Sequence, residues 1–304
     1  MVHFLNLIRY KNLLMLVLVQ VVIKYALFEP FQIDTSLTRL EFYLLILATI
    51  CIAAAGNIIN DIQDVHIDKI NKPNQVLIGK KITEKTGYNY YLILNILGVC
   101  IGFYLANSIG KPSFAALFIV FSGLLYLYAT FLKSIAIVGN VVVSFLVAMS
   151  IIIVGLFDLF PAITETNRAS QSAIFSILLE YAFFAFLMTF NREIIKDIQD
   201  MNGDKNGGLQ TLPILLGKKR TAKVALFLTI ITIGVLIFYI YTYLYKQQLL
   251  LLYFLILVIG PLIYVSIKVY AAEKRSEFKQ VSDLLKLIML FGILSLALYP
   301  FLIK

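Results

Sequence analysis

Four oxygen-bearing side chains around position 64 are spaced so that they could bind a divalent metal ion. Asn60, Asp64 and Asp68 recur every four residues, and Asp61 follows the first of them directly. In a helix that continues through this stretch, residues four apart lie on the same face. The spacing therefore predicts a stripe of amide and carboxylate oxygens along one side of a helix.

A second acidic stretch repeats this arrangement 136 residues further along the chain. Asn202 and Gly203 within it, and then Asn206–Gly208, are poor helix formers, so we expect them to loosen or end its helix. Its four carboxylates are spaced four, three and four residues apart, again on one helical face: Glu193, Asp197, Asp200 and Asp204.

The loops that carry these acids resemble each other over their whole length. Both read Asp-Ile-Gln-Asp, then three residues, Asp-Lys, and later Gly-Lys-Lys with a threonine two residues on, ending at Thr83 and Thr221. Chance similarity of two polar loops is the simpler alternative. A duplication would instead bring two acidic clusters together around a pseudo-two-fold axis, as internal repeats do in transporters.

Two facing carboxylate stripes repel each other unless cations lie between them. Mg²⁺ suits such a site, because it prefers oxygen ligands and is usually shared between carboxylates and substrate phosphates. Bound to a diphosphate, it would neutralise the leaving group as its bond to carbon breaks. Basic side chains predicted on the same side could assist: Lys72, Lys133, Arg192 and Lys196. Solvated helix ends, or a purely structural ion site, are the alternative.

The elements that must position these residues are membrane spans. Of the 304 residues, 61% are hydrophobic and only 14% charged, whereas soluble domains are about 25% charged. A span needs roughly 20 mostly apolar residues. Nine stretches qualify, at about 12–29, 40–60, 88–108, 113–132, 135–157, 171–192, 222–245, 248–270 and 284–303. We expect an all-α, polytopic membrane protein with one domain, 1–304, built around a central cavity.

The basic residues predict how the chain is oriented. Of the 26 lysines and arginines, 20 lie at the N-terminus or in and next to the connections that follow the second, fourth, sixth and eighth spans. Five lie on the other side, and Lys24 falls well within a span. The richer side is cytoplasmic by the positive-inside rule. We therefore expect an integral protein of the cell membrane, with a cytoplasmic N-terminus and active site and an external C-terminus. The charge of +9 then faces anionic lipid rather than nucleic acid.

The motifs resemble those of the UbiA-type intramembrane prenyltransferases. Asn60, Asp61, Asp64 and Asp68 match the first family motif, Asn-Asp-x-x-Asp-x-x-x-Asp. Arg-Glu-Ile-Ile-Lys-Asp-Ile-Gln-Asp, ending at Asp200, and the later Thr-Leu-Pro-Ile-Leu-Leu-Gly are most similar to the branch that makes digeranylgeranylglyceryl phosphate.

Further motifs extend the resemblance over nearly the whole chain. Tyr128 and Lys133 resemble the family's Tyr/Lys motif after the fourth span, and Gly-Asn-Val-Val-Val-Ser, with Asn140, resembles the start of its fifth. Arg9 and Asn12 resemble the Arg-x-x-Asn that precedes the first.

The resemblance implies a Mg²⁺-dependent enzyme that transfers a prenyl group from a prenyl pyrophosphate. It implies metal ligands at Asn60, Asp61, Asp64, Asp68, Asp200 and Asp204, and catalytic roles for Arg9, Tyr128, Lys133, Glu193 and Asp197. Lys72, Arg192 and Lys196 would bind substrate, and Asn12 and Asn140 would lie near the acceptor.

The acceptor stays open at this point. A lipid such as geranylgeranylglyceryl phosphate is one alternative, and an aromatic ring, as in quinone or haem synthesis, is another. Gln75 and Gln210 stand where the family usually has basic residues, which leaves substrate identity unsettled. A cation-coupled transporter is the rival from another class, although transporter sites lie near the bilayer midplane.

Overall fold

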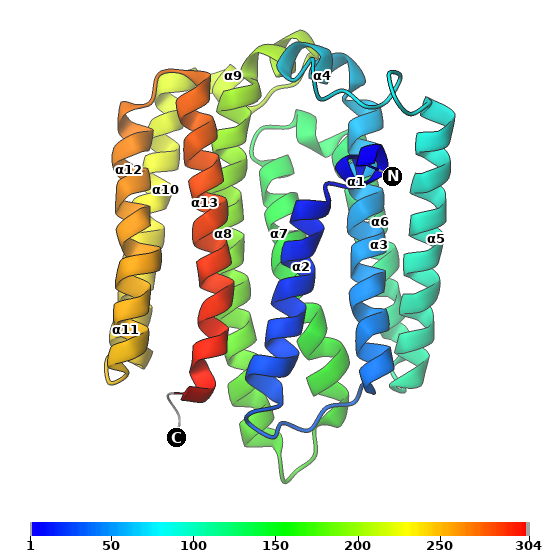
Figure 1. Cartoon of the computed structure of the whole chain (residues 1–304), viewed down its shortest axis with the longest axis vertical. Coiled ribbons are helices and arrows are strands. Elements are labelled where there is room, and N and C mark those ends of the chain that lie inside the picture. Colours follow the sequence, from blue (N-terminus) through cyan, green and yellow to red (C-terminus); the bar gives the residue numbers. More distant parts are fainter. Residues whose placement is uncertain (1, 302–304) are drawn as a thin grey trace. The chain divides into compact units, whose positions relative to one another are not determined.

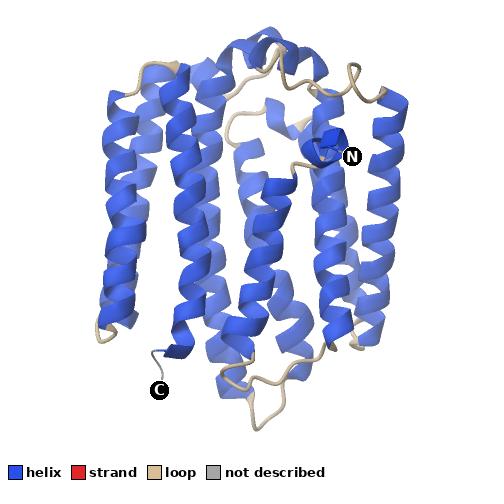
Figure 2. Cartoon of the chain, in the orientation of Figure 1, coloured by secondary structure: helices blue, strands red, loops and turns tan. Residues whose placement is uncertain are grey.

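The structure, a computed structural model, describes residues 2–301. Every regular element in these residues is a helix (Figure 2). The prediction of an all-α, polytopic protein with nine spans is confirmed for the part of the chain described. Nine helices are long and apolar enough to cross a bilayer: Tyr10–Phe28, Arg39–Gln63, Glu84–Ser108, Pro112–Thr130, Val138–Ala162, Arg168–Asn206, Lys218–Leu244, Gln248–Ala271 and Arg275–Phe301.

The described chain divides into two compact units. The first unit comprises residues 2–21, 32–133 and 149–180. The second comprises residues 22–31, 134–148 and 181–301. The single domain expected from the sequence stays a prediction.

The first unit is built around α3, Arg39–Gln63. This helix packs against α5, Glu84–Ser108, which lies beside it in Figure 1. Gly98 of α5 lets the backbones approach, because a Cβ there would meet the Ile52 side chain at 2.8 Å. Small residues serve this purpose in membrane helix pairs. Its other helices are α1 (Val2–Leu7), most of α2 (Tyr10–Val22), α4 (Val65–Asn71), η2 (Pro112–Phe114), α6 (Ala115–Thr130), η4 (Gly155–Leu159) and η5 (Phe160–Ala162).

The second unit contains the last three spans and the later part of the sixth. The helix α10, Lys218–Tyr239, packs against α12, Gly260–Ala271, and both lie side by side in Figure 1. The helix α12 also packs against α13, Arg275–Ser295. The remaining elements of this unit are η1 (Ile23–Phe28), α9 (Leu212–Leu216), η6 (Ile240–Leu244), α11 (Gln248–Phe254), η7 (Leu255–Ile259) and η8 (Leu296–Phe301).

Besides α2, whose last residue Val22 belongs to the second unit, two helices run from one unit into the other along the continuous backbone. The helix α7, Val138–Val154, begins in the second unit, and α8, Arg168–Asn206, begins in the first. The segment η3, Leu132–Ser134, spans the same division. The second acidic motif lies on the part of α8 that belongs to the second unit.

The expectations about both motif helices were wrong in detail. The helix α8 continues through Asn202 and Gly203 instead of loosening or ending there, and it ends at Asn206, where Asn206–Gly208 predicted an end. The first motif does not lie on one uninterrupted helix, because α3 ends at Gln63 and α4 begins at Val65. The helical hydrogen-bond pattern nevertheless continues across the break, since the backbone amide of Asp64 donates to the Asn60 carbonyl at 2.9 Å.

Candidate active site

Asp64 is the best-connected acid of the first motif. It sits at the junction of α3 and α4, with φ −90° and ψ 4°. Its Oδ1 lies 2.5 Å from Nζ of Lys133, and its Oδ2 accepts a hydrogen bond of 2.8 Å from the Asn60 amide. Lys133 also approaches Oδ1 of Asn60, at 3.4 Å. The side chains of Lys133 and Asp64 are only 13% and 16% exposed, so salt screens the attraction between them less than it screens a surface ion pair.

Arg9 holds the second acid of this motif. Its Nη2 donates to Oδ1 of Asp61 at 2.7 Å. Burial acts to lower the pKa of the Arg9 guanidinium, but the charge and hydrogen bond of Asp61, together with Tyr128 and Asp68, raise the pKa above its ordinary value. Tyr128 lies close enough to contribute to the same electrostatic environment.

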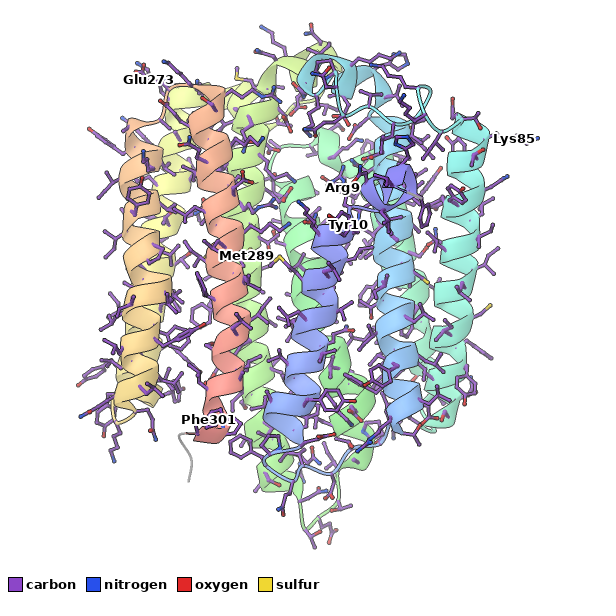
Figure 3. The ribbon with its side chains drawn as sticks, viewed as in Figure 1. Arg9, Tyr10, Lys85, Glu273, Met289 and Phe301 are labelled. Carbon is purple, nitrogen blue, oxygen red and sulfur yellow. The ribbon has the colours of Figure 1, made fainter. Side chains whose placement is uncertain are left out.

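The backbone of Arg9 is in a left-handed conformation. Its φ of +53° is uncommon for a residue with a side chain. Arg9 forms the turn between α1 and α2, where Figure 3 labels it beside Tyr10. The Asn12 amide donates to the Arg9 carbonyl at 2.8 Å, which places Asn12 one turn into α2. Strained residues of this kind persist where their surroundings fix them, often at functional sites.

Asp68 completes the first cluster. Its Oδ1 lies 3.8 Å from Nζ of Lys72, four residues on. Burial raises the pKa of Asp68 above its ordinary value, Lys72 opposes that rise, and the negative charges of Asp64 and Asp61 add to it. Negative charge is therefore crowded here, which is the condition that a divalent cation would relieve.

The second cluster lies on α8. Oδ2 of Asp197 accepts a 2.9 Å hydrogen bond from the Asn140 amide, at the start of α7. Asn140 is buried. Glu193, also buried, accepts from Nζ of Lys196 at 2.8 Å and from Nη1 of Arg192 at 3.2 Å. Four of the predicted site residues are thus gathered on one stretch of α8, and α7 supplies the fifth.

Asp200 is paired with a residue that the sequence did not suggest. Its Oδ1 accepts from Nη2 of Arg275 at 3.0 Å. Nε of the same guanidinium donates to the Gln199 carbonyl at 2.9 Å. Asp204 is buried one turn further on, and its carbonyl accepts from the Leu209 amide at 3.0 Å as the chain leaves α8.

Comparison with known proteins identifies the family. A model of the UbiA prenyltransferase family matches residues 17–290. The chain belongs to the UbiA prenyltransferase family. With its nine membrane-length apolar helices in the described residues, it is an integral membrane prenyltransferase.

Individual members of the family cover nearly the whole chain. A digeranylgeranylglyceryl phosphate synthase from Methanosphaera stadtmanae is 32% identical over 84% of this chain and 88% of its own length. A structure concerned with digeranylgeranylglyceryl phosphate synthase in membranes has a TM-score of 0.64 and 25% identity over 97% of this chain and 98% of its own. A UbiA homolog from Archaeoglobus fulgidus bound to GPP and Mg²⁺ has a TM-score of 0.57 and 16% identity over 97% and 99%, respectively, and shows the shared fold.

The donor set of this UbiA chain fits Mg²⁺. The acids of the first motif provide carboxylate and amide oxygens, and none of its members is a thiol or imidazole ligand. Among residues 2–301, no three Asp, Glu, His or Cys side chains already surround one point where a metal could sit. Mg²⁺ does not need such a cage, because one or two carboxylates and substrate phosphates usually complete its coordination. The residues therefore suit a metal that arrives together with a diphosphate.

Sequence reasoning missed Arg275. It lies 75 residues from Asp200 in the chain, outside the acidic motifs and the other motifs that resemble those of the family. The only signal was its position in the basic connection before the last span. A long-range partner of this kind becomes visible only when the packing of α13 against α8 is known.

Proposed function

We propose that this UbiA chain transfers a geranylgeranyl group from its diphosphate to the free hydroxyl of geranylgeranylglyceryl phosphate. Support for the acceptor comes from the relative named digeranylgeranylglyceryl phosphate synthase, which is 32% identical over most of both chains. The observation that carries the reaction type is the pairing of Lys133 with Asp64 and of Arg9 with Asp61. Metal ligands and phosphate-binding cations are interleaved in one cluster.

Arg9 and Lys133 are proposed to bind the diphosphate. Arg presents several donors that match phosphate oxygens, and Lys adds a compact positive charge. In the present structure both cations neutralise carboxylates. When Mg²⁺ occupies those carboxylates, it supplies Lewis-acid stabilisation of the departing diphosphate. Arg9 and Lys133 then become available to hold the phosphate oxygens.

The acids of α8 are proposed to complete the machinery. Asp200 and Asp204 contribute further metal ligands, and Asp61 and Asp68 serve beside Asp64 and Asn60. Asn140 orients Asp197 through their hydrogen bond of 2.9 Å. Lys196 and Arg192 hold Glu193, and Lys72 lies against Asp68 on the other motif. Tyr128, near Arg9, shields the bond that breaks from water, while Asn12 orients the acceptor.

The reaction exchanges one C–O bond for another. The bond between C1 of the prenyl chain and the diphosphate oxygen breaks, and its electron pair leaves with the diphosphate. The acceptor hydroxyl oxygen forms a new bond to C1 and loses its proton. Both prenyl chains are apolar, so they remain among the membrane-spanning helices while the charged groups meet at the helix ends.

The direct test is product formation by the purified full-length protein in nanodiscs. We would supply Mg²⁺, labelled prenyl diphosphates of different lengths, and a panel containing geranylgeranylglyceryl phosphate and aromatic acceptors. Mass spectrometry is expected to detect the doubly prenylated glyceryl phosphate. Prenylation of the aromatic acceptors alone would overturn the proposed acceptor and keep the reaction type.

Matched variants separate chemistry from folding. Asp64→Asn removes one carboxylate charge and keeps the side-chain size, so product should be lost while the protein remains folded. Asp283→Asn makes the same change at an exposed position on α13 and should retain activity. Full activity of Asp64→Asn would refute the assignment of Asp64 as a metal ligand.

We also propose that the acidic motifs and the N-terminus face the cytoplasm in the cell membrane, with the C-terminus outside. The excess of basic residues on the motif-bearing side supports this orientation. A single cysteine replacing Lys80, in a variant lacking Cys51 and Cys100, should be labelled only after a membrane-impermeant reagent enters the cell. A cysteine replacing Glu165 should be labelled from outside. The reverse pattern would invert the proposed orientation.

A further inference from the structure

The contacts around the two acidic motifs follow the same order along the chain. In the first half, Arg9 precedes the motif and binds Asp61, 52 residues away, and Lys133 follows it and binds Asp64, 69 residues away. In the second half, Asn140 precedes the motif and binds Asp197, 57 residues away. Arg275 follows it and binds Asp200, 75 residues away. The corresponding intervals differ by only five and six residues.

The backbone repeats as well. Arg9 has a φ of +53° just before the first span, and Ile137 has a φ of +71° just before the fifth. A β-branched residue with such an angle is a genuine outlier. Each half therefore begins its first span from a strained non-glycine residue, close to the side chain that contacts the first aspartate of its motif.

Arg275 occupies the place in the second half that Lys133 occupies in the first. We propose that Arg275 is a diphosphate-binding residue, which pairs with Asp200 in this structure and moves onto the diphosphate when Mg²⁺ takes that carboxylate. This inference rests on the proposed function and assigns it a further residue. The guanidinium suits the role, because its planar fork matches phosphate oxygens with two parallel hydrogen bonds.

Hydrogen bonds at the start of α13 position Arg275, in addition to its ion pair with Asp200. Glu277 accepts hydrogen bonds from the amides of Glu273 and Lys274, which fixes the start of α13. Figure 3 labels Glu273 just before this end of α13. Two side chains of α8 hold the next turns of α13. Nε2 of Gln199 donates to the Phe278 carbonyl at 3.3 Å, and Nε of Arg192 donates to the Ser282 carbonyl at 3.3 Å.

The side chain of Arg275 also has room to change partner. It is 52% exposed, whereas its partner Asp200 is 18% exposed. Its Nε bond to the Gln199 carbonyl anchors the guanidinium while Nη2 is engaged with the carboxylate. An exchange of Asp200 for a phosphate oxygen therefore requires a change at one end of the fork, with the other end still anchored.

The test measures binding, because a loss of turnover alone would not distinguish this role from a structural one. We would use the full-length protein in neutral phosphatidylcholine nanodiscs, since anionic lipids attract cations themselves. Mn²⁺ stands in for Mg²⁺, because both suit carboxylate ligands, and free Mn²⁺ is counted by its paramagnetic resonance signal. Inorganic pyrophosphate in saturating Mg²⁺ is the second probe, measured by calorimetry.

Arg275→Gln is expected to change the two affinities in opposite directions. Mn²⁺ alone should bind severalfold more tightly, because it no longer displaces a cation from Asp200. Pyrophosphate should bind about tenfold more weakly, because a charge-assisted contact is lost. Lys133→Gln should give the same split through Asp64. Lys279→Gln removes one exposed positive charge from the same helix and should change neither affinity.

Unchanged pyrophosphate affinity in Arg275→Gln, or a parallel fall in both affinities, would overturn the inference. Should that variant fail to fold, Arg275→Lys keeps the charge and loses the fork, so pyrophosphate affinity should still fall, and wild-type affinity there would count against the proposal. The proposed function fails separately, if Asp64→Asn and Asp200→Asn bind both probes as the wild type does.

Discussion

The two acidic motifs share the string Asp-Ile-Gln-Asp, yet their backbones differ. In the first, α3 ends at Gln63 and α4 begins at Val65, with Asp64 between them. In the second, α8 runs unbroken to Asn206. Intrinsic propensity favours the opposite outcome, because the second motif has Asn202 and Gly203, which disfavour helix, where the first has His66 and Ile67. Local preference therefore does not decide the backbone at either motif.

Long-range contacts account for the difference. At the break in the first motif, Asp64 forms an ion pair with Lys133 of η3, an element distant in the sequence. In the second, α8 is tied to the start of α13 by four contacts, here called the α13 clamp: Arg275 with Gln199, Arg275 with Asp200, Gln199 with Phe278, and Arg192 with Ser282. Arg9 and Lys133, which pair with acids of the first motif, come from separate elements, whereas the contacts of the α13 clamp all come from one helix.

The largest expected effect tests whether the two motifs are equal partners. Asp64→Asn and Asp200→Asn should each lower kcat/KM by about 10²–10³-fold, because each removes a carboxylate from metal that stabilises the leaving group. Prenyl transfer assays at saturating Mg²⁺ measure this, with thermal unfolding as the control for folding. A large loss in only one of the two variants would break the proposed equivalence.

A smaller effect should separate the two residues that precede the motifs. Arg9→Gln should lower kcat/KM by about 100-fold, because it removes both the Asp61 contact and a charge for the diphosphate. Asn140→Ala removes one hydrogen bond to Asp197 and should cost about tenfold. Lys11→Gln is the matched control, since Lys11 is exposed two residues from Arg9. Equal losses in the first two variants would contradict a charge-specific role for Arg9.

The sequence was sufficient for the spans and insufficient for their ends. Long apolar runs mark the part of each helix that lies in the membrane, so all nine spans were predictable. The ninth begins at Arg275, not near residue 284, because charged residues such as Lys279 and Asp283 extend it beyond its apolar part. For the same reason α8 continues past Arg192 to Asn206. The length of an apolar run predicts the part of a helix that lies in the bilayer, whereas the helix itself can continue into the polar residues on either side.

The candidate site divides in the same way. The spacing of Asn60, Asp64 and Asp68 predicted a shared face, and the helical hydrogen-bond pattern across Asp64 largely preserves it. The partners of these acids were a different matter. Lys133 and Arg9 were suggested by family resemblance, whereas Arg275 had no such signal. A contact across 75 residues depends on how α13 packs on α8, and spacing within one motif contains no information about it.

The α13 clamp can be weakened at a residue outside the proposed chemistry. Gln199→Ala removes one hydrogen bond to the Phe278 carbonyl, which is worth about 1 kcal/mol. Backbone amides at the end of α8, residues 200–206, should then exchange about fivefold faster, because local opening becomes easier. Hydrogen exchange read by mass spectrometry measures this, with Gln280→Ala on the exposed face of α13 as control. Unchanged exchange would mean that the clamp does not keep α8 continuous.

The smallest expected effect concerns the residue that propensity alone would blame for a helix break. Asn202 is exposed on α8, and the Asn206 side chain donates to its backbone carbonyl, which a substitution leaves in place. Asn202→Ala should therefore stabilise α8 by about 0.5 kcal/mol, seen as slower exchange of the neighbouring amides. His66→Ala at the equivalent position of the first motif should gain less, because α4 is only seven residues long and begins one residue earlier. A larger gain at His66 would show that propensity, and not the ion pair at Asp64, limits the first motif.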